Sequence, residues 1–483
     1  MNLKKIFQKP FFLIFLFITF IDLTSFISFL IFELNKIFFI ILSLIIFLIS
    51  LFKIDYALFA LLAELFIGSK GHLFYLEVGS FRISFRMILF TIVILTWFFG
   101  LIKGKYKASF LRSKFFPFYL LFFVFLFLGV LIGFFNRNQK DLIFFDANAW
   151  LYFLLIFPFF DVINLKDFET IFKILTASFV YLAIKTFVIF FLFTHQIKTI
   201  MPDLYYWIRT RGLGEITALD SFYRIFFQSQ IYSLIGFFII LSLIVFSQKL
   251  KNFWYLLIPT TSIIISFSRS YWLAFSLTLL IFLLFLKIKE IDWHLFKKIT
   301  LATIFVILFS FALIYLSLKL PPKVKIEIGS LIEKRFEVEE PAFSSRIAQL
   351  PYLLKAILEK PIFGSGFGKT VSYFSHDPRA LERHPLGFYT TYAFEWGYLD
   401  IWLKIGLIGL FSFLILIFKI FKEGSKLISN SQLISNEKKG LILGLNFGLI
   451  ALIFTHLSSP YLNHPLGIGY LMLLMVIYEK SKT

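Results

Sequence analysis

Arginine and glycine residues stand together in one polar stretch of the sequence, where they could bind an anion. The stretch contains Trp207, then Arg209 and Arg211 followed by glycines, with Arg224 further on. Arginine presents a planar fork of N–H donors that matches phosphate and carboxylate groups, and glycine lets the backbone approach such a ligand. The alternative is an interfacial loop, with Trp207 at headgroup depth and the arginines on lipid phosphates. Either interpretation predicts contact with an anion.

Arg269 stands between two apolar runs with almost no loop around it. Its neighbours are Ser268 and Ser270, followed by Tyr271 and Trp272. A charged side chain at a membrane edge is costly and marks a functional site by default, although a long side chain can also extend to the interface from there. We predict that Arg269 contributes to anion binding.

A longer polar stretch, 319–398, begins with two prolines and continues with groups suited to chemistry. Loops of such length are usually functional. Within it, 345–360 places apolar residues at helical spacing, which predicts an amphipathic helix that carries Arg346. The glycine-rich residues 361–370 end like a nucleotide-binding loop, but Phe363 stands where that motif needs glycine. We predict instead a flexible turn that admits a substrate.

Carboxylates and imidazoles follow this turn, and such groups can accept the proton of an attacking hydroxyl. A divalent-metal site is conceivable, but the spacing matches no specific motif, and we predict no metal. The alternative is a hydrated loop without chemistry. The chain has no cysteine, which excludes a thiolate nucleophile and a thiolate zinc site. The candidate groups are His376, Asp377, Glu382, His384 and Glu395.

Membrane-spanning helices must position these residues. Of the 483 residues, 59% are apolar and 16% charged, against about half and a quarter in soluble domains. The net charge of +20 comes from basic residues that punctuate apolar runs, so no nucleic-acid partner is predicted. Lipid permits only helices or closed barrels, and continuous apolar runs select helices. We predict an all-α, polytopic integral membrane protein with about 14 transmembrane helices. The predicted spans are 11–32, 37–52, 56–68, 87–102, 115–135, 150–163, 171–193, 231–247, 253–267, 271–288, 299–318, 399–421, 440–457 and 464–478.

Lysine clusters set the predicted orientation, because lysine and arginine are enriched in cytoplasmic loops. Clusters at 103–114 and 419–439 then lie inside, and both termini are cytoplasmic. Every arginine except Arg112 faces outside or lies at the outer rim. The long outer segments include 194–230 and 319–398. This separation of arginine from lysine favours an external anionic ligand.

Motifs around the longest outer segment resemble the O-antigen ligase and polymerase superfamily. The resemblance covers about 230–420 and divides the chain into N-terminal helices (1–230), a catalytic region (231–421) and C-terminal helices (422–483). The motifs are Ser268-Arg269-Ser270-Tyr271-Trp272-Leu273-Ala274, Arg346 with its helix, Glu359-Lys-Pro361-Ile-Phe-Gly364-Ser-Gly366-Phe-Gly368, and Tyr398-Leu399-Asp-Ile-Trp-Leu-Lys-Ile-Gly406-Leu-Ile-Gly409-Leu.

The resemblance implies a bacterial inner-membrane glycosyltransferase of the GT-C type, with an active site that faces the periplasm. Such enzymes move a glycan from an undecaprenyl-diphosphate carrier to an acceptor hydroxyl, without metal, nucleotide or other cofactor. The acceptor is a carrier-linked glycan for a polymerase and lipid A-core for a ligase. Arginines bind the diphosphate leaving group, a role that the resemblance implies for Arg211, Arg269 and Arg346, with Arg224 beside them.

Two positions depart from the family pattern. Many members carry His-Asn and one further residue before the Tyr-Leu pair, and that histidine is a favoured base. Here Glu395 stands in its place, and a carboxylate can do the same chemistry. Glu395 is therefore the first candidate base and His384 the second. Lys404 stands where members often carry an acidic residue.

Two questions of function stay open in the sequence. No motif separates ligase from polymerase, although a count of fourteen helices leans towards polymerase. The alternative class is a lipid-linked oligosaccharide flippase or another polysaccharide transporter. The few charges within the spans and the lack of an inverted repeat of interrupted helices argue against a transporter.

Overall fold

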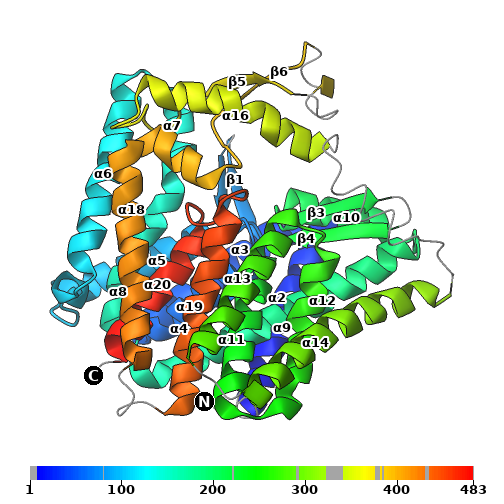
Figure 1. The fold of residues 1–483 in the computed structure, drawn as a ribbon. Coiled ribbons are helices and arrows are strands. Elements are labelled where there is room, and N and C mark those ends of the chain that lie inside the picture. Colours follow the sequence, from blue (N-terminus) through cyan, green and yellow to red (C-terminus); the bar gives the residue numbers. More distant parts are fainter. Residues whose placement is uncertain are drawn as a thin grey trace.

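The computed structural model describes residues 8–79, 81–219, 222–289, 293–321, 341–375, 381–382, 386–429 and 435–481. Most of its helices run side by side as a bundle (Figure 1). Three β-hairpins and the crosswise helix α16 gather at one end of this bundle, which we call the loop end. Both ends of the described chain lie at the opposite end (Figure 1).

Each apolar run that was predicted to span the membrane is helical in the structure, since a helix satisfies its own backbone hydrogen bonds in lipid. The helices of the N-terminal half are α2 (Lys9–Leu30), α3 (Phe32–Phe52), α4 (Ile54–Ile67), α5 (Phe85–Ile102), α6 (Phe116–Phe135), α7 (Lys140–Ala147), α8 (Ile156–Val162), α9 (Phe168–Thr194) and α10 (Met201–Thr210). Those of the C-terminal half are α11 (Ile231–Ser247), α12 (Leu257–Ile265), α13 (Arg269–Ile288), α14 (Trp293–Lys319), α16 (Pro341–Glu359), α18 (Gly397–Ser429), α19 (Asn436–His456) and α20 (Pro465–Lys480).

Eleven helical segments among the described residues are long and apolar enough to cross a membrane. This result confirms the prediction of an all-α, polytopic membrane protein. The count of about 14 stays a prediction, because three of the predicted spans form shorter helices. These are α4 with 14 residues, α12 with 9 and α20 with 16.

The centre of the bundle is the contact between α11 and α19. Gly440, Gly444 and Gly448 recur on one face of α19, a spacing that lets helix backbones approach closely in membranes. A Cβ atom added at Gly444 would lie 2.5 Å from the Cα of Ile239 on α11. Any side chain at Gly444 would therefore push the two helices apart.

Charges inside the helices are paired where helices meet. Lys185 on α9 lies 2.7 Å from Asp22 on α2, and both side chains are buried. Arg86 on α5 lies 2.7 Å from Glu64 on α4. Because a buried charge is costly unless it is paired, these groups fasten neighbouring helices to each other.

Three two-stranded antiparallel hairpins, which were not predicted from the sequence, occupy loops at the loop end. They pair β1 (Tyr75–Val78) with β2 (Phe81–Ser84), β3 (Gly214–Leu219) with β4 (Phe222–Phe227), and β5 (Val371–Phe374) with β6 (Phe388–Thr391). The second hairpin contains Arg224, so that part of the predicted loop 194–230 is ordered strand rather than irregular chain.

The amphipathic helix predicted at 345–360 is α16, which lies across the loop end (Figure 1). Its buried face holds Leu353, Ala356 and Ile357, which pack with Val371 and other apolar residues of the loop end. Leu358 on the same helix is 70% exposed. Helix α16 is thus held to the bundle along one face only.

Candidate active site

Two of the predicted anion-binding arginines lie beside the turn between α12 and α13. Arg224 on β4 donates from Nε to the carbonyl oxygen of Ser266, at 2.9 Å. Arg269 is the first residue of α13, just past that turn. The turn passes through Phe267 with φ of 45°, which makes the change of direction abrupt. The structure therefore brings Arg224 and Arg269 to one corner of the loop end.

A short segment from the last residue of α19 to just before α20, residues 456–463, fastens this corner. The hydroxyls of Ser458 and Ser459 donate to Ser270 Oγ at 2.9 and 3.0 Å. The hydroxyls of Tyr271 and Tyr461 lie 2.5 Å apart. The residues that directly follow Arg269 are thus bonded to the C-terminal helices.

The same segment and the last turn of α19 also fix the first turn of α18. Asn463 donates from its side-chain amide to Asp400 Oδ2 at 2.9 Å, and the hydroxyl of Tyr398 donates to the carbonyl oxygen of Ile453 at 3.0 Å. Gly397 lies so close to His456 that an added Cβ would be 2.4 Å from the imidazole. The start of α18 and the start of α13 therefore share one anchoring segment.

Glu395, the predicted base, lies just before α18 and forms an ion pair with Arg346 on α16. The Arg346 side chain is 24% exposed and that of Glu395 50% exposed, so the pair is open to solvent mainly on the Glu395 side. The indole N–H of Trp396 donates to the carbonyl oxygen of Arg346 at 3.0 Å and holds α16 against this position. Two residues with different predicted roles are thus in direct contact.

The structure does not bring Arg211 to this group. The Arg211 side chain is 1% exposed and points between α2, α3 and β1. Its guanidinium donates to Asn35 Oδ1 at 2.6 Å and to Ser28 Oγ at 3.1 Å, and it lies 4.7 Å from the ring centre of Tyr75. Burial lowers the pKa of Arg211 to about 10, so it keeps its charge at neutral pH. Its contacts are those of a side chain that joins helices to a hairpin.

Some of the predicted acid–base groups lie outside the described residues. His384, the second candidate base, is one of these, as are His376 and Asp377. Glu382 is described and exposed. Within the described ranges, no group of three or more histidine and acidic side chains could hold a metal ion.

A buried cluster of charges that was not predicted from the sequence lies beneath the start of α18. Lys404 forms ion pairs with Asp146 on α7 and, at 2.6 Å, with Asp400 one turn earlier on α18. Asp146 also accepts from the backbone N–H of Gly368 at 2.9 Å. The signal was present, because Asp400 and Lys404 have the spacing of a helical ion pair, but their partner on α7 is far away in sequence.

The glycine turn was predicted to be flexible, and the structure shows that it is packed. The backbone N–H of Ser365 donates to Leu403 O at 2.7 Å, and that of Gly366 donates to Lys404 O at 3.0 Å. These carbonyls of α18 are available because the helix is kinked at Gly406, which has φ of 73°. A Cβ at Gly366 would lie 2.1 Å from the backbone nitrogen of Gly133, so glycine is needed for contact rather than for motion.

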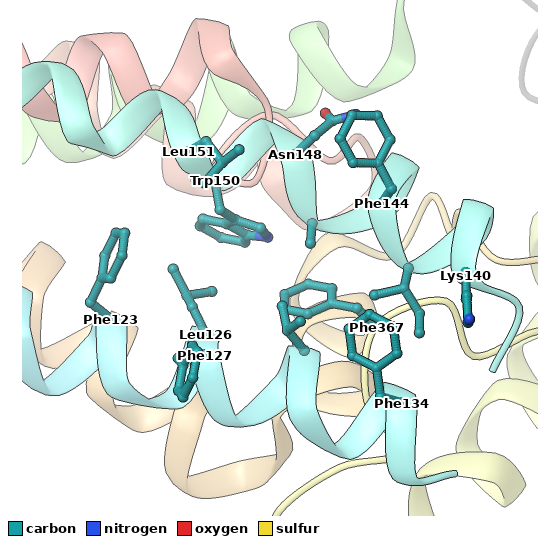
Figure 2. Close-up of a pocket in the computed structure, with 13 residues that line it drawn as sticks. Phe123, Leu126, Phe127, Phe134, Lys140, Phe144, Asn148, Trp150, Leu151 and Phe367 are labelled. Carbon is teal, nitrogen blue, oxygen red and sulfur yellow. The ribbon is translucent and has the colours of Figure 1, made fainter. Parts of the chain in front are cut away.

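An apolar groove of about 280 Å³ lies between α6 and the segment formed by α7 and the 3₁₀ helix Asn148–Leu155. In Figure 2, aromatic and aliphatic side chains from these two elements face each other across the groove. Phe367 extends into it from the glycine turn, and Lys140 stands at one end. The lining residues are Phe123, Leu126, Phe127, Val130, Phe134, Lys140, Ile143, Phe144, Ala147, Asn148, Trp150, Leu151 and Phe367. One side of this groove therefore touches the turn that Asp146 and Lys404 hold.

Fold and site together define a multi-pass membrane protein that gathers arginines and a carboxylate at one end of a helical bundle. Residues 254–414, about a third of the chain, match the family described as O-antigen ligase. The match supports the resemblance to the O-antigen ligase and polymerase superfamily. It includes Arg269, Arg346 and Glu395 and falls inside the predicted region 231–421, whose own boundaries stay a prediction. No curated protein matches the chain.

Proposed function

We propose that the protein is a glycosyltransferase that moves a glycan from an undecaprenyl-diphosphate carrier to an acceptor hydroxyl. The proximity of Arg346 and Glu395 supports this proposal best, because a cation suited to binding a diphosphate lies beside a carboxylate suited to accepting a proton. The family match at 254–414 agrees with a lipid-linked glycan donor and a polysaccharide acceptor. The proposed reaction uses no metal and no cofactor.

In the proposed reaction, the acceptor oxygen forms a bond to the anomeric carbon of the glycan. The bond from that carbon to the diphosphate oxygen breaks, and the diphosphate leaves with the electron pair. Glu395 takes the proton of the acceptor hydroxyl. Arg224, Arg269 and Arg346 bind the diphosphate, because fixed cations stabilise the charge that develops on a leaving group. Arg211 stays outside this proposal because its guanidinium is enclosed.

We also propose that the loop end faces the periplasm of a bacterial inner membrane, with both termini in the cytoplasm. The ends of the described chain lie opposite the loop end, which agrees with this orientation (Figure 1). The chain has no cysteine, so a single cysteine at exposed Thr390 or Lys426 can be labelled with an impermeant thiol reagent. Labelling at Thr390 alone in intact spheroplasts agrees with the proposal, and labelling at Lys426 alone contradicts it.

The test of function is incubation of the purified chain in liposomes with a lipid-linked glycan, with and without lipid A-core. We expect a new glycosidic product. Longer carrier-linked chains without core identify a polymerase, and glycan on lipid A-core identifies a ligase. Movement of the lipid-linked glycan across the bilayer without a new bond would overturn the proposal in favour of a flippase.

The apolar groove fits the hydrocarbon part of such a substrate, since it opens between two membrane helices and is lined by apolar side chains. We expect Val130→Phe to fill the groove and raise the KM for the undecaprenyl-linked donor about tenfold, which corresponds to roughly 1.4 kcal/mol of lost contact. The KM for a donor with a very short chain should not change. Val124→Phe is the matched control, because Val124 is on the same helix, is 46% exposed and does not line the groove. An equal effect of both variants would refute this role.

A further inference from the structure

The Arg346–Glu395 ion pair joins two groups that the proposed reaction needs apart. The guanidinium must bind the diphosphate of the donor, and the carboxylate must accept a proton from the acceptor. In the structure each neutralises the other. A carboxylate and a phosphate oxygen use the same fork of N–H donors on an arginine. They therefore compete for Arg346.

The surroundings of the pair determine which partner can move. Arg346 belongs to α16, whose buried face includes Leu353. The backbone carbonyl oxygen of Arg346 also accepts a hydrogen bond from the indole N–H of Trp396. Glu395 lies in the irregular segment between β6 and α18, and its side chain is half exposed. Phe394, directly before Glu395, is only 2% exposed, and Trp396, directly after it, is bonded to α16. The backbone is therefore held on both sides of Glu395. Exchange of partners thus requires only rotation of the Glu395 side chain.

We propose that Glu395 is a built-in competing anion that occupies Arg346 until the donor diphosphate replaces it. This inference rests on the proposed function. The arriving diphosphate carries more negative charge than a carboxylate and takes the guanidinium. Glu395 is then released, with its lone pairs available to the acceptor hydroxyl. Donor binding precedes activation of the acceptor, and the base works only in the donor complex.

The test is Glu395→Gln, which removes the charge and keeps the size of the side chain. We expect the Kd for farnesyl diphosphate, measured with the purified full chain in detergent, to fall about two- to fivefold, the size expected for loss of a solvent-exposed ion pair. Glycan transfer should fall about 10²- to 10⁴-fold, as for loss of a general base. Tighter binding together with slower transfer is a combination that loss of a merely structural ion pair does not produce. Glu395→Ala removes the same charge and provides the test if the glutamine variant does not accumulate.

Two further variants make the result specific. Glu359→Gln breaks an exposed ion pair with Lys369 at the end of the same helix and should change neither binding nor transfer. In an Arg346→Ala background, Glu395→Gln should no longer tighten binding, because the shared partner is gone. Unchanged or weaker binding in Glu395→Gln would overturn the competition while leaving the glycosyltransferase proposal intact. Full transfer by Glu395→Gln would instead overturn the role of Glu395 as base.

Discussion

Replacement of Arg269 or Arg346 by alanine is expected to slow glycan transfer about 10²- to 10³-fold without reducing the amount of protein in the membrane. The magnitude is that of losing one preorganised group that stabilises developing charge. Both residues are of intermediate exposure, so their side chains are partly open to solvent. Their removal therefore leaves no apolar cavity in the bundle. Transfer from the lipid-linked donor in liposomes, compared at equal protein amounts, measures the effect.

Arg82 offers the control for this experiment. It is also an arginine of the loop end, its side chain is 49% exposed, and it pairs with Glu77 on the same hairpin. Arg82→Ala should retain wild-type transfer. Arg346→Lys should recover only part of the lost rate, since an ammonium keeps the charge but not the planar fork. Wild-type glycan ladders from Arg269→Ala or Arg346→Ala would exclude that residue from the diphosphate site.

Replacement of Lys404 by methionine is expected to destabilise the fold by about 3–5 kcal/mol, the effect of removing one partner from a buried ion pair. The variant keeps the volume of the side chain but leaves Asp146 and Asp400 facing each other without a cation. We expect a lower amount of folded protein in the membrane and a lower melting temperature in detergent.

A compensated variant separates charge from packing at this cluster. Lys404→Met combined with Asp146→Asn and Asp400→Asn removes all three charges and should recover most of the lost stability, because uncharged groups of similar volume often replace a buried ion pair at little cost. Lys355→Met changes an exposed lysine of α16 and should have almost no effect. A melting temperature of Lys404→Met equal to that of the wild type would show that the cluster contributes little to stability.

The sequence predicted the helices well because each is a long apolar run, and lipid leaves the backbone of such a run no alternative to helix. It did not predict the hairpins, since short strands in polar loops carry weak periodicity. Charge patterns indicated which segments hold arginine, but not how deeply each side chain is buried. Arg211 and Arg224 belong to one loop, yet Arg211 is enclosed among N-terminal helices and Arg224 reaches the α12–α13 turn.

The site contacts that could not be predicted from the sequence join segments far apart in the chain. Arg346 and Glu395 were each singled out for a separate role, but one sequence carries no sign that they touch. Lys404 was recognised as a departure from the family pattern, and its meaning depends on Asp146, which belongs to another helix. Pairing of this kind follows from packing in three dimensions, which the apolar pattern of single helices does not encode.

The segment 456–463 has a consequence for how such proteins can be recombined. The stretch that matches the O-antigen ligase family ends at residue 414, yet the starts of α13 and α18 are bonded to Ser458, Tyr461 and Asn463 beyond it. A chimera that exchanges only 254–414 with another protein would break every one of these bonds at the graft. Exchange of the family domain together with the C-terminal helices would keep these bonds, but the contacts of Lys404 with Asp146 and of Ser266 with Arg224 would still cross the N-terminal boundary.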